Sequence, residues 1–149
     1  MLSNQTQKSK LEDFKINIKL KLAALWVAVM FCYVYGDFFS LFVPGRIQGL
    51  MDGSSGVGTT TPLSLLSFAI MMTIPSLMIF LSLVFKPQLN RITNVVTGIL
   101  FTLIMALIVT KSMSEWKIFY VYLACIEMIL TSSIIWLALR WPRAKNENN

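Results

Sequence analysis

The sequence predicts an all-α integral membrane protein, a four-helix bundle with both termini in the cytoplasm. Of its 149 residues, 56% are hydrophobic and only 13% are charged, which is more apolar than a soluble domain of this length. The apolar residues also fall into four runs of about the 20 residues that a helix needs to span a bilayer. We therefore expect one four-helix domain over residues 22–141, preceded by a basic segment, 1–21, and followed by a polar tail, 142–149.

The amino-terminal segment has five lysines against two acids. Between Leu11 and Leu22 its apolar residues recur at three- and four-residue spacing, which indicates a basic amphipathic helix on the membrane surface. A solvated tail without fixed structure is the alternative. No A-x-A cleavage site follows the apolar run, so we expect the first helix to be retained and not removed as a signal peptide.

The first predicted span, residues 22–43, ends at a Pro-Gly pair that cannot continue a helix. It carries one carboxylate, Asp37, near its far end. Tyr33 lies one helical turn earlier on the same face, so its hydroxyl can support the acid, and Tyr35 is a second nearby tyrosine. The connection that follows holds five of the seven glycines without a phosphate-binding pattern. We expect a flexible linker there, with a short interfacial turn around residues 47–51.

The second predicted span, residues 63–85, contains Pro75. Proline has no amide hydrogen to donate to the carbonyl of Met71, so it bends the helix, and Thr73 and Ser76 are placed to satisfy the freed backbone. A kink at this depth either opens a cavity or only adjusts packing, and packing is the simpler interpretation.

The third predicted span, residues 93–110, follows a short polar turn over 86–92 that makes it an antiparallel neighbour of the second. Asn90, Arg91 and Asn94 cluster where it begins, and we interpret them as helix-end or lipid-headgroup contacts. The fourth span, residues 116–139, has tryptophan or tyrosine at both ends, as in the aromatic belts of membrane proteins.

The two acids inside predicted spans, Asp37 and Glu127, fall at overlapping depths when counted along their helices from the basic residues at the helix ends. A carboxylate at mid-membrane costs about 2.5–3.5 kcal/mol, so each should face the bundle interior and be paired, hydrated or protonated. Such a pair suits a proton-coupled transporter or a cation-binding cavity. The polar residues nearest to the acids complete this candidate proton, cation or substrate site: Tyr33, Tyr35 and Thr131. Alternatively, the acids only fix helix packing, with Asp37 hydrated or paired with Arg46 or Lys117 at the rim.

Several chemistries are excluded. The chain has no histidine, which removes His-based zinc sites, imidazole-ligated haem and histidine-activated nucleophiles. Its two cysteines, Cys32 and Cys125, lack CxxC spacing and are interpreted as small buried apolar residues. We predict no catalytic residue, no metal site and no cofactor. The basic residues border apolar runs, so we expect the lipid bilayer as partner and no nucleic acid.

The 13 lysines and arginines also predict the orientation. Ten lie in the amino-terminal segment, the second connection and the carboxy-terminal segment, and three lie in the first and third connections. Because cytoplasmic loops carry the excess of basic residues, we expect both termini inside, in a cytoplasmic (inner) membrane.

Five short motifs occur in order along the chain. They are Y-G-D at 35–37, I-P-S-L-M-I-F-L-S at 74–82, N-R-I-T-N at 90–94, Glu127, and W-L-A-L-R-W at 136–141. With this order, the chain resembles the DUF6326 family of small bacterial four-helix membrane proteins of uncharacterised function, over residues 20–141. The resemblance implies the architecture and a bacterial inner membrane. It points to Asp37, Arg91, Asn94 and Glu127 without giving them a role.

Three functional hypotheses remain open. The first is a small transporter or channel-like subunit whose acids bind protons, a cation or a cationic solute, as a homo-oligomer because four helices enclose little volume. The second is a structural or accessory subunit without transport activity. The third, the weakest, is a redox-linked enzyme like the four-helix DoxX proteins, which a disulfide between the two cysteines would favour. We place solute or proton handling slightly ahead.

Overall fold

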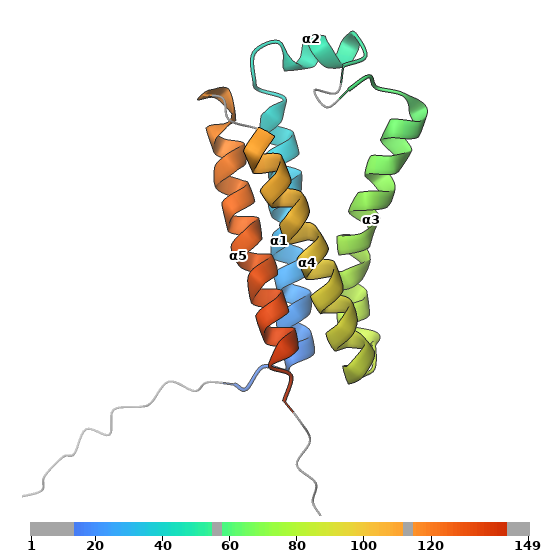
Figure 1. The fold of residues 1–149 in the computed structure, drawn as a ribbon, viewed down its shortest axis with the longest axis vertical. Helices are drawn as coiled ribbons and strands as arrows, with labels where there is room; N and C mark the ends of the chain where they lie inside the picture. The colour runs from blue at the N-terminus through green and yellow to red at the C-terminus, as the bar shows by residue number, and fades with distance from the viewer. Residues whose placement is uncertain (1–13, 55–57, 112–114, 143–149) are drawn as a thin grey trace, which may run out of the picture.

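The computed structural model describes residues 14–54, 58–111 and 115–142. In this part of the chain, four helices are long and apolar enough to cross a membrane, which indicates a membrane protein. They form one bundle (Figure 1): α1 (Ile18–Ser40), α3 (Pro62–Val84), α4 (Pro87–Lys111) and α5 (Ile118–Leu139). The short helix α2 (Arg46–Met51) crosses one end of the bundle, and the 3-10 turn η1 (Glu115–Lys117) leads into α5. The predicted all-α class is confirmed.

Helix α1 begins four residues before its predicted start because Asn17 caps it. The backbone of Asn17 is extended, and its side chain accepts a hydrogen bond from the amide of Lys19 at 2.9 Å. Residues 14–17 are not helical, so the amphipathic helix predicted between Leu11 and Leu22 is wrong over these residues. The rest of that prediction, over residues 1–13, lies outside the described residues.

The first connection is more ordered than the expected linker. Helix α2 begins after Gly45, whose φ of 76° is in the left-handed region, and Gly53 adopts a similar φ of 78° after the helix ends. The amide of Thr60 then donates to the carbonyl of Gly53 at 2.7 Å, which closes this part of the connection over the bundle end.

Helix α3 starts at a capping box, in which Thr61 and Ser64 each bond the other's backbone amide. Pro75 lies inside the helix and is buried. Thr73 and Ser76 were expected to satisfy the backbone that the proline frees, but neither hydroxyl donates to the carbonyl of Met71. Each hydroxyl donates to the carbonyl four residues before it, at 2.8 Å.

Helix α4 starts six residues earlier than predicted, and the turn expected over 86–92 is therefore wrong from Pro87 onward. Proline suits the first position of a helix, and the amide of Asn90 already donates to the carbonyl of Lys86 at 2.9 Å. As a consequence, Asn90 and Asn94 lie one and two turns inside α4 and not at its entrance.

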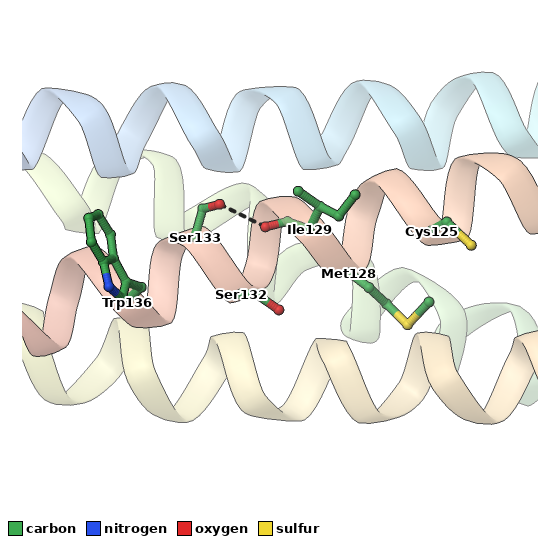
Figure 2. A pocket seen from close by; sticks show the side chains of 6 residues that line it. All are labelled: Cys125, Met128, Ile129, Ser132, Ser133 and Trp136. Atoms are coloured by element: carbon green, nitrogen blue, oxygen red, sulfur yellow. Dashed lines mark hydrogen bonds between the residues drawn. The ribbon is translucent and has the colours of Figure 1, made fainter.

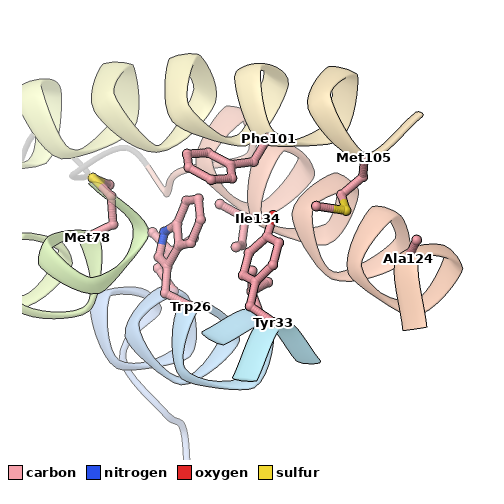
Figure 3. Close-up of a cluster of buried hydrophobic side chains, with 9 residues drawn as sticks. Trp26, Tyr33, Met78, Phe101, Met105, Ala124 and Ile134 are labelled. Carbon is pink, nitrogen blue, oxygen red and sulfur yellow. The ribbon is translucent and has the colours of Figure 1, made fainter. Parts of the chain in front are cut away.

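The core lies between α1, α4 and α5, with α3 packed on α1. Trp26 and Tyr33 point from α1 towards Phe101 on α4, each with its ring centroid about 6 Å from the Phe101 ring and nearly edge-on (Figure 3). Helices α4 and α5 approach closely at Gly98, where an added Cβ would lie 2.8 Å from Cγ1 of Ile135. The absence of a side chain at this position lets the two helices approach closely.

Candidate functional site

A cleft of about 490 Å³ lies at the end of the bundle that α2 crosses, and we call it the α2 cleft. Every helix of the bundle contributes to its lining, together with α2 and the residues on either side of it. In Figure 1 the first half of α3 leans away from α4 at this end. The cleft therefore lies between that half of α3 and the other three long helices.

Pro75 marks the place on α3 where the cleft gives way to packed core. Met71 and Met72, before the proline, line the cleft, whereas Met78 and Ser82, after it, are buried in the bundle. The sequence left open whether the kink opens a cavity or adjusts packing. The cleft lies on the amino-terminal side of this proline.

Asp37 lines the α2 cleft near the end of α1 and is exposed there. The same cleft is lined by Arg46, from the start of α2, and by Lys117, just before α5. The guanidinium of Arg46 interacts electrostatically with the carboxylate of Asp37. The three charged groups thus share one cleft, with Asp37 accessible from it.

Glu127 lies deeper, on α5. It is only 3% exposed, and its Oε2 atom is buried without a hydrogen-bond partner among the residues that the structure describes. Tyr33 lines the cleft, and its hydroxyl is likewise buried without a hydrogen-bond partner among the described residues. The Glu127 carboxyl interacts electrostatically with Tyr33 and with Asp37. The structure therefore brings Tyr33 and Asp37 together in the cleft, with Glu127 within electrostatic range of both.

Two predicted neighbours of the acids do not contact their carboxyl groups through hydrogen bonds. Thr131 donates its hydroxyl to the backbone carbonyl of Glu127 at 2.9 Å and accepts from Thr102 at 2.7 Å, so it joins α4 to α5 and does not bond the carboxyl. Tyr35 is 51% exposed and stacks between Phe31 and Phe39 on the outward face of α1. It does not line the cleft.

Sequence reasoning missed Tyr120 as a cleft residue. Tyr120 lines the cleft from α5, two turns before Glu127, and an added Cβ on Gly36 would lie 3.5 Å from its ring. The signal was present in the sequence, because the spacing of seven residues places Tyr120 and Glu127 on one face.

The model of a family of unknown function, DUF6326, matches residues 9–148 of the chain. The chain belongs to the DUF6326 family. No curated protein and no solved structure matches it. Membership confirms the resemblance drawn from the short motifs, and it brings no activity with it.

The opposite end of this DUF6326 protein holds a buried polar group that we call the asparagine cluster. Its members come from α1, α3 and α4: Trp26, Ser82, Asn90 and Asn94. Trp26 Nε1 donates to Asn94 Oδ1 at 2.8 Å, and Asn94 Nδ2 donates to Asn90 Oδ1 at 2.6 Å. Asn90 Nδ2 donates to the carbonyl of Ser82, whose hydroxyl lies 3.3 Å from Asn94 Oδ1.

This cluster corrects the interpretation of two residues predicted as helix-end or headgroup contacts. Asn90 and Asn94 are fully buried and bond other helices, because α4 begins earlier than expected. Arg91 is exposed beside them, and its contact with a lipid headgroup stays a prediction. Trp26 and Ser82 were not predicted as partners, because their contacts depend on how three helices are rotated.

Neither cysteine of this DUF6326 protein takes part in a disulfide. Cys32 is half-buried, and Cys125 is exposed, so the prediction that both are buried is wrong for Cys125. Cys125 lines a shallow outward groove along α5 with Ser132 and Trp136 (Figure 2). Among the described residues no group of three His, Cys, Asp or Glu side chains could hold a metal ion.

Proposed function

We propose that this DUF6326 protein couples a proton or a cation to the handling of a small solute, with Glu127 as the coupling carboxyl. One observation carries the proposal: Glu127 Oε2 and the hydroxyl of Tyr33, a residue that lines the α2 cleft, are both buried without a hydrogen-bond partner among the described residues. Buried polar atoms that serve packing are normally hydrogen-bonded. A carboxyl without such bonds is available to bind a proton or a cation.

The neighbouring groups support exchange between this carboxyl and the cleft. Asp37 is exposed in the cleft, and Tyr33 lies one turn deeper on the same face of α1. Tyr120 lines the cleft from α5, on the face that carries Glu127. Tyrosine hydroxyls both donate and accept hydrogen bonds, so the two tyrosines can relay a proton between the acids.

We also propose that both ends of the chain face the cytoplasm across an inner membrane. Helix α1 begins and α5 ends at the same end of the bundle (Figure 1), and the basic residues concentrate in the segments of that end. A reporter domain that works only in the cytoplasm should be active when it is fused to either end of the chain. A reporter that is active outside the cell at either end contradicts the orientation.

The coupling role is tested by infrared difference spectroscopy of the purified protein in lipid, between acidic and alkaline buffer. We expect a band of a protonated carboxyl that changes with pH and is lost in Glu127→Gln. Asp52→Asn is the matched control, because Asp52 is an exposed acid in the first connection that does not line the cleft and bonds Gln48. It should keep the band.

The proposal fails if the spectrum of folded Glu127→Gln contains the same pH-dependent band as the unaltered protein. It also fails if the unaltered protein has no such band while its helices are intact. In either case Glu127 neither gains nor loses a proton, and the structural or accessory role becomes the better account.

A further inference from the structure

We infer that the α2 cleft binds a zwitterionic amphiphile, a molecule with a phosphate, a primary ammonium group a few bonds away and an apolar chain, as in a phosphoethanolamine lipid. This inference names the solute class of the proposed function and rests on it. It is argued from the charges of the cleft, from its apolar walls and from its position at one end of the spans.

The charges in the cleft are mixed in sign. Arg46 is half-buried with its Nε enclosed by protein, and Lys117 lies on the same rim. Guanidinium and ammonium groups bind phosphate oxygens with charge-assisted hydrogen bonds. Asp37 faces the same space and offers a carboxylate to an ammonium group. A simple cation would meet two basic residues and a simple anion would meet the acid, whereas a zwitterion satisfies both.

The walls of the cleft are apolar on two sides. Phe68, Met71 and Met72 on α3 line it opposite Met105 and Ile108 on α4. Methionine side chains are flexible and polarizable, so they adapt to chains of different shape. The volume of about 490 Å³ is typical of a pocket for a small molecule and leaves room for a headgroup and the first part of a chain.

The position of the cleft fits a lipid in its membrane. Arg46 begins α2 and Lys117 ends η1, so both lie at the ends of the long helices, and lipid phosphates lie at the ends of helices that span a bilayer. Below them, the first half of α3 leans away from α4 (Figure 1), and exposed apolar side chains such as Leu66 and Leu103 cover these helices. A chain bound between the two walls can therefore extend into the surrounding hydrocarbon while its headgroup stays on the rim.

Binding is tested with three lysophospholipids of identical chain that carry ethanolamine, glycerol or choline headgroups, measured by native mass spectrometry on the purified full chain. We expect the ethanolamine lipid to bind about tenfold more tightly than the glycerol lipid, which lacks the ammonium group. Asp37→Asn should remove this preference and leave binding of the glycerol lipid intact. Arg46→Gln should weaken both lipids about equally.

Two matched controls lie outside the cleft. Asp52→Asn removes an exposed acid, and Arg140→Gln removes an arginine that stacks on Trp136 at the opposite end, so neither should change the preference. Met72→Trp fills the cleft without altering a charge and should weaken binding of the ethanolamine lipid.

Two results overturn the inference. Equal binding of all three lipids, unchanged by every variant, shows only non-specific lipid contact. Tighter binding of the glycerol lipid, sensitive to Arg46→Gln but not to Asp37→Asn, shows a simple anion site. Glu127 does not line the cleft, so Glu127→Gln should keep the ethanolamine preference. Loss of headgroup selectivity and loss of the infrared band are therefore separate failures, the first of this inference and the second of the proposed function.

Discussion

The two ends of the bundle differ in whether their buried polar atoms are hydrogen-bonded. In the asparagine cluster, the indole of Trp26 and the amides of Asn90 and Asn94 bond across three helices. Near the α2 cleft, Glu127 Oε2 and the Tyr33 hydroxyl are equally buried, yet neither has a hydrogen-bond partner among the described residues. Burial away from water costs free energy at both ends, but only in the asparagine cluster do hydrogen bonds offset this cost.

This difference suggests a structural role for the asparagine cluster and a functional role for Glu127 and Tyr33. A satisfied network fixes the rotation of its helices and gains stability. An unsatisfied carboxyl lowers stability, which is the pattern found where a group is kept available for chemistry. The comparison therefore predicts that substitutions at the two ends will change the free energy of unfolding in opposite directions.

The largest effect is expected at the asparagine cluster. Asn94→Ala leaves the Trp26 indole N–H and the Asn90 Oδ1 atom without their partner, so it should lower the free energy of unfolding by about 3 kcal/mol. Unfolding in mixed detergent micelles, followed by tryptophan fluorescence, measures the loss. Arg91→Gln, an exposed change on the same helix, is the control and should stay within about 0.5 kcal/mol. Equal stability of both variants would show that the cluster is not the structural end.

Glu127→Gln should have a smaller effect on stability than Asn94→Ala, and it should not be destabilising. It replaces a carboxyl whose Oε2 has no hydrogen bond to lose, so stability should be unchanged or rise by about 1 kcal/mol. The same unfolding assay gives the value. A loss as large as that of Asn94→Ala would mean that the carboxyl stabilises the bundle and would remove the distinction between the ends.

The smallest effect is expected for Tyr33→Phe. The hydroxyl that it removes is buried without a partner, while the ring keeps its edge-on contact with Phe101. Stability should change by less than about 1 kcal/mol, in the stabilising direction. Trp26→Phe is the matched comparison, because it removes a donor that is hydrogen-bonded, and it should be clearly destabilising. If Tyr33→Phe destabilises the protein as much as Trp26→Phe, the hydroxyl has a structural partner.

Much of the fold could be predicted from the sequence, because four long apolar runs leave few alternatives in a chain of this length. The predicted starts of α1 and α4 were wrong for local reasons: Asn17 caps the first helix earlier, and Pro87 begins the other at its first position. Helix α2 lies where a short interfacial turn was expected, around residues 47–51. Its helical form was not predicted, because a glycine-rich connection gives little periodic signal.

The candidate site was predictable only in part. Helical spacing placed Tyr33 with Asp37, and depth along the chain placed Glu127 near them. The contact between Trp26 and Asn94 spans 68 positions and depends on how two helices are rotated about their axes, which an almost uniformly apolar sequence does not specify. The cleft depends likewise on how the first half of α3 leans away from α4.

The most direct test of the central claim is labelling with a hydrophobic carbodiimide, located by peptide mass spectrometry. Carbodiimides react with protonated carboxyl groups in apolar surroundings, and our account makes Glu127 such a group. We predict an adduct on Glu127 that forms more slowly as the pH rises and is absent in Glu127→Gln. Failure to modify Glu127 at any pH, in protein that is folded and accessible to the reagent, would contradict the account.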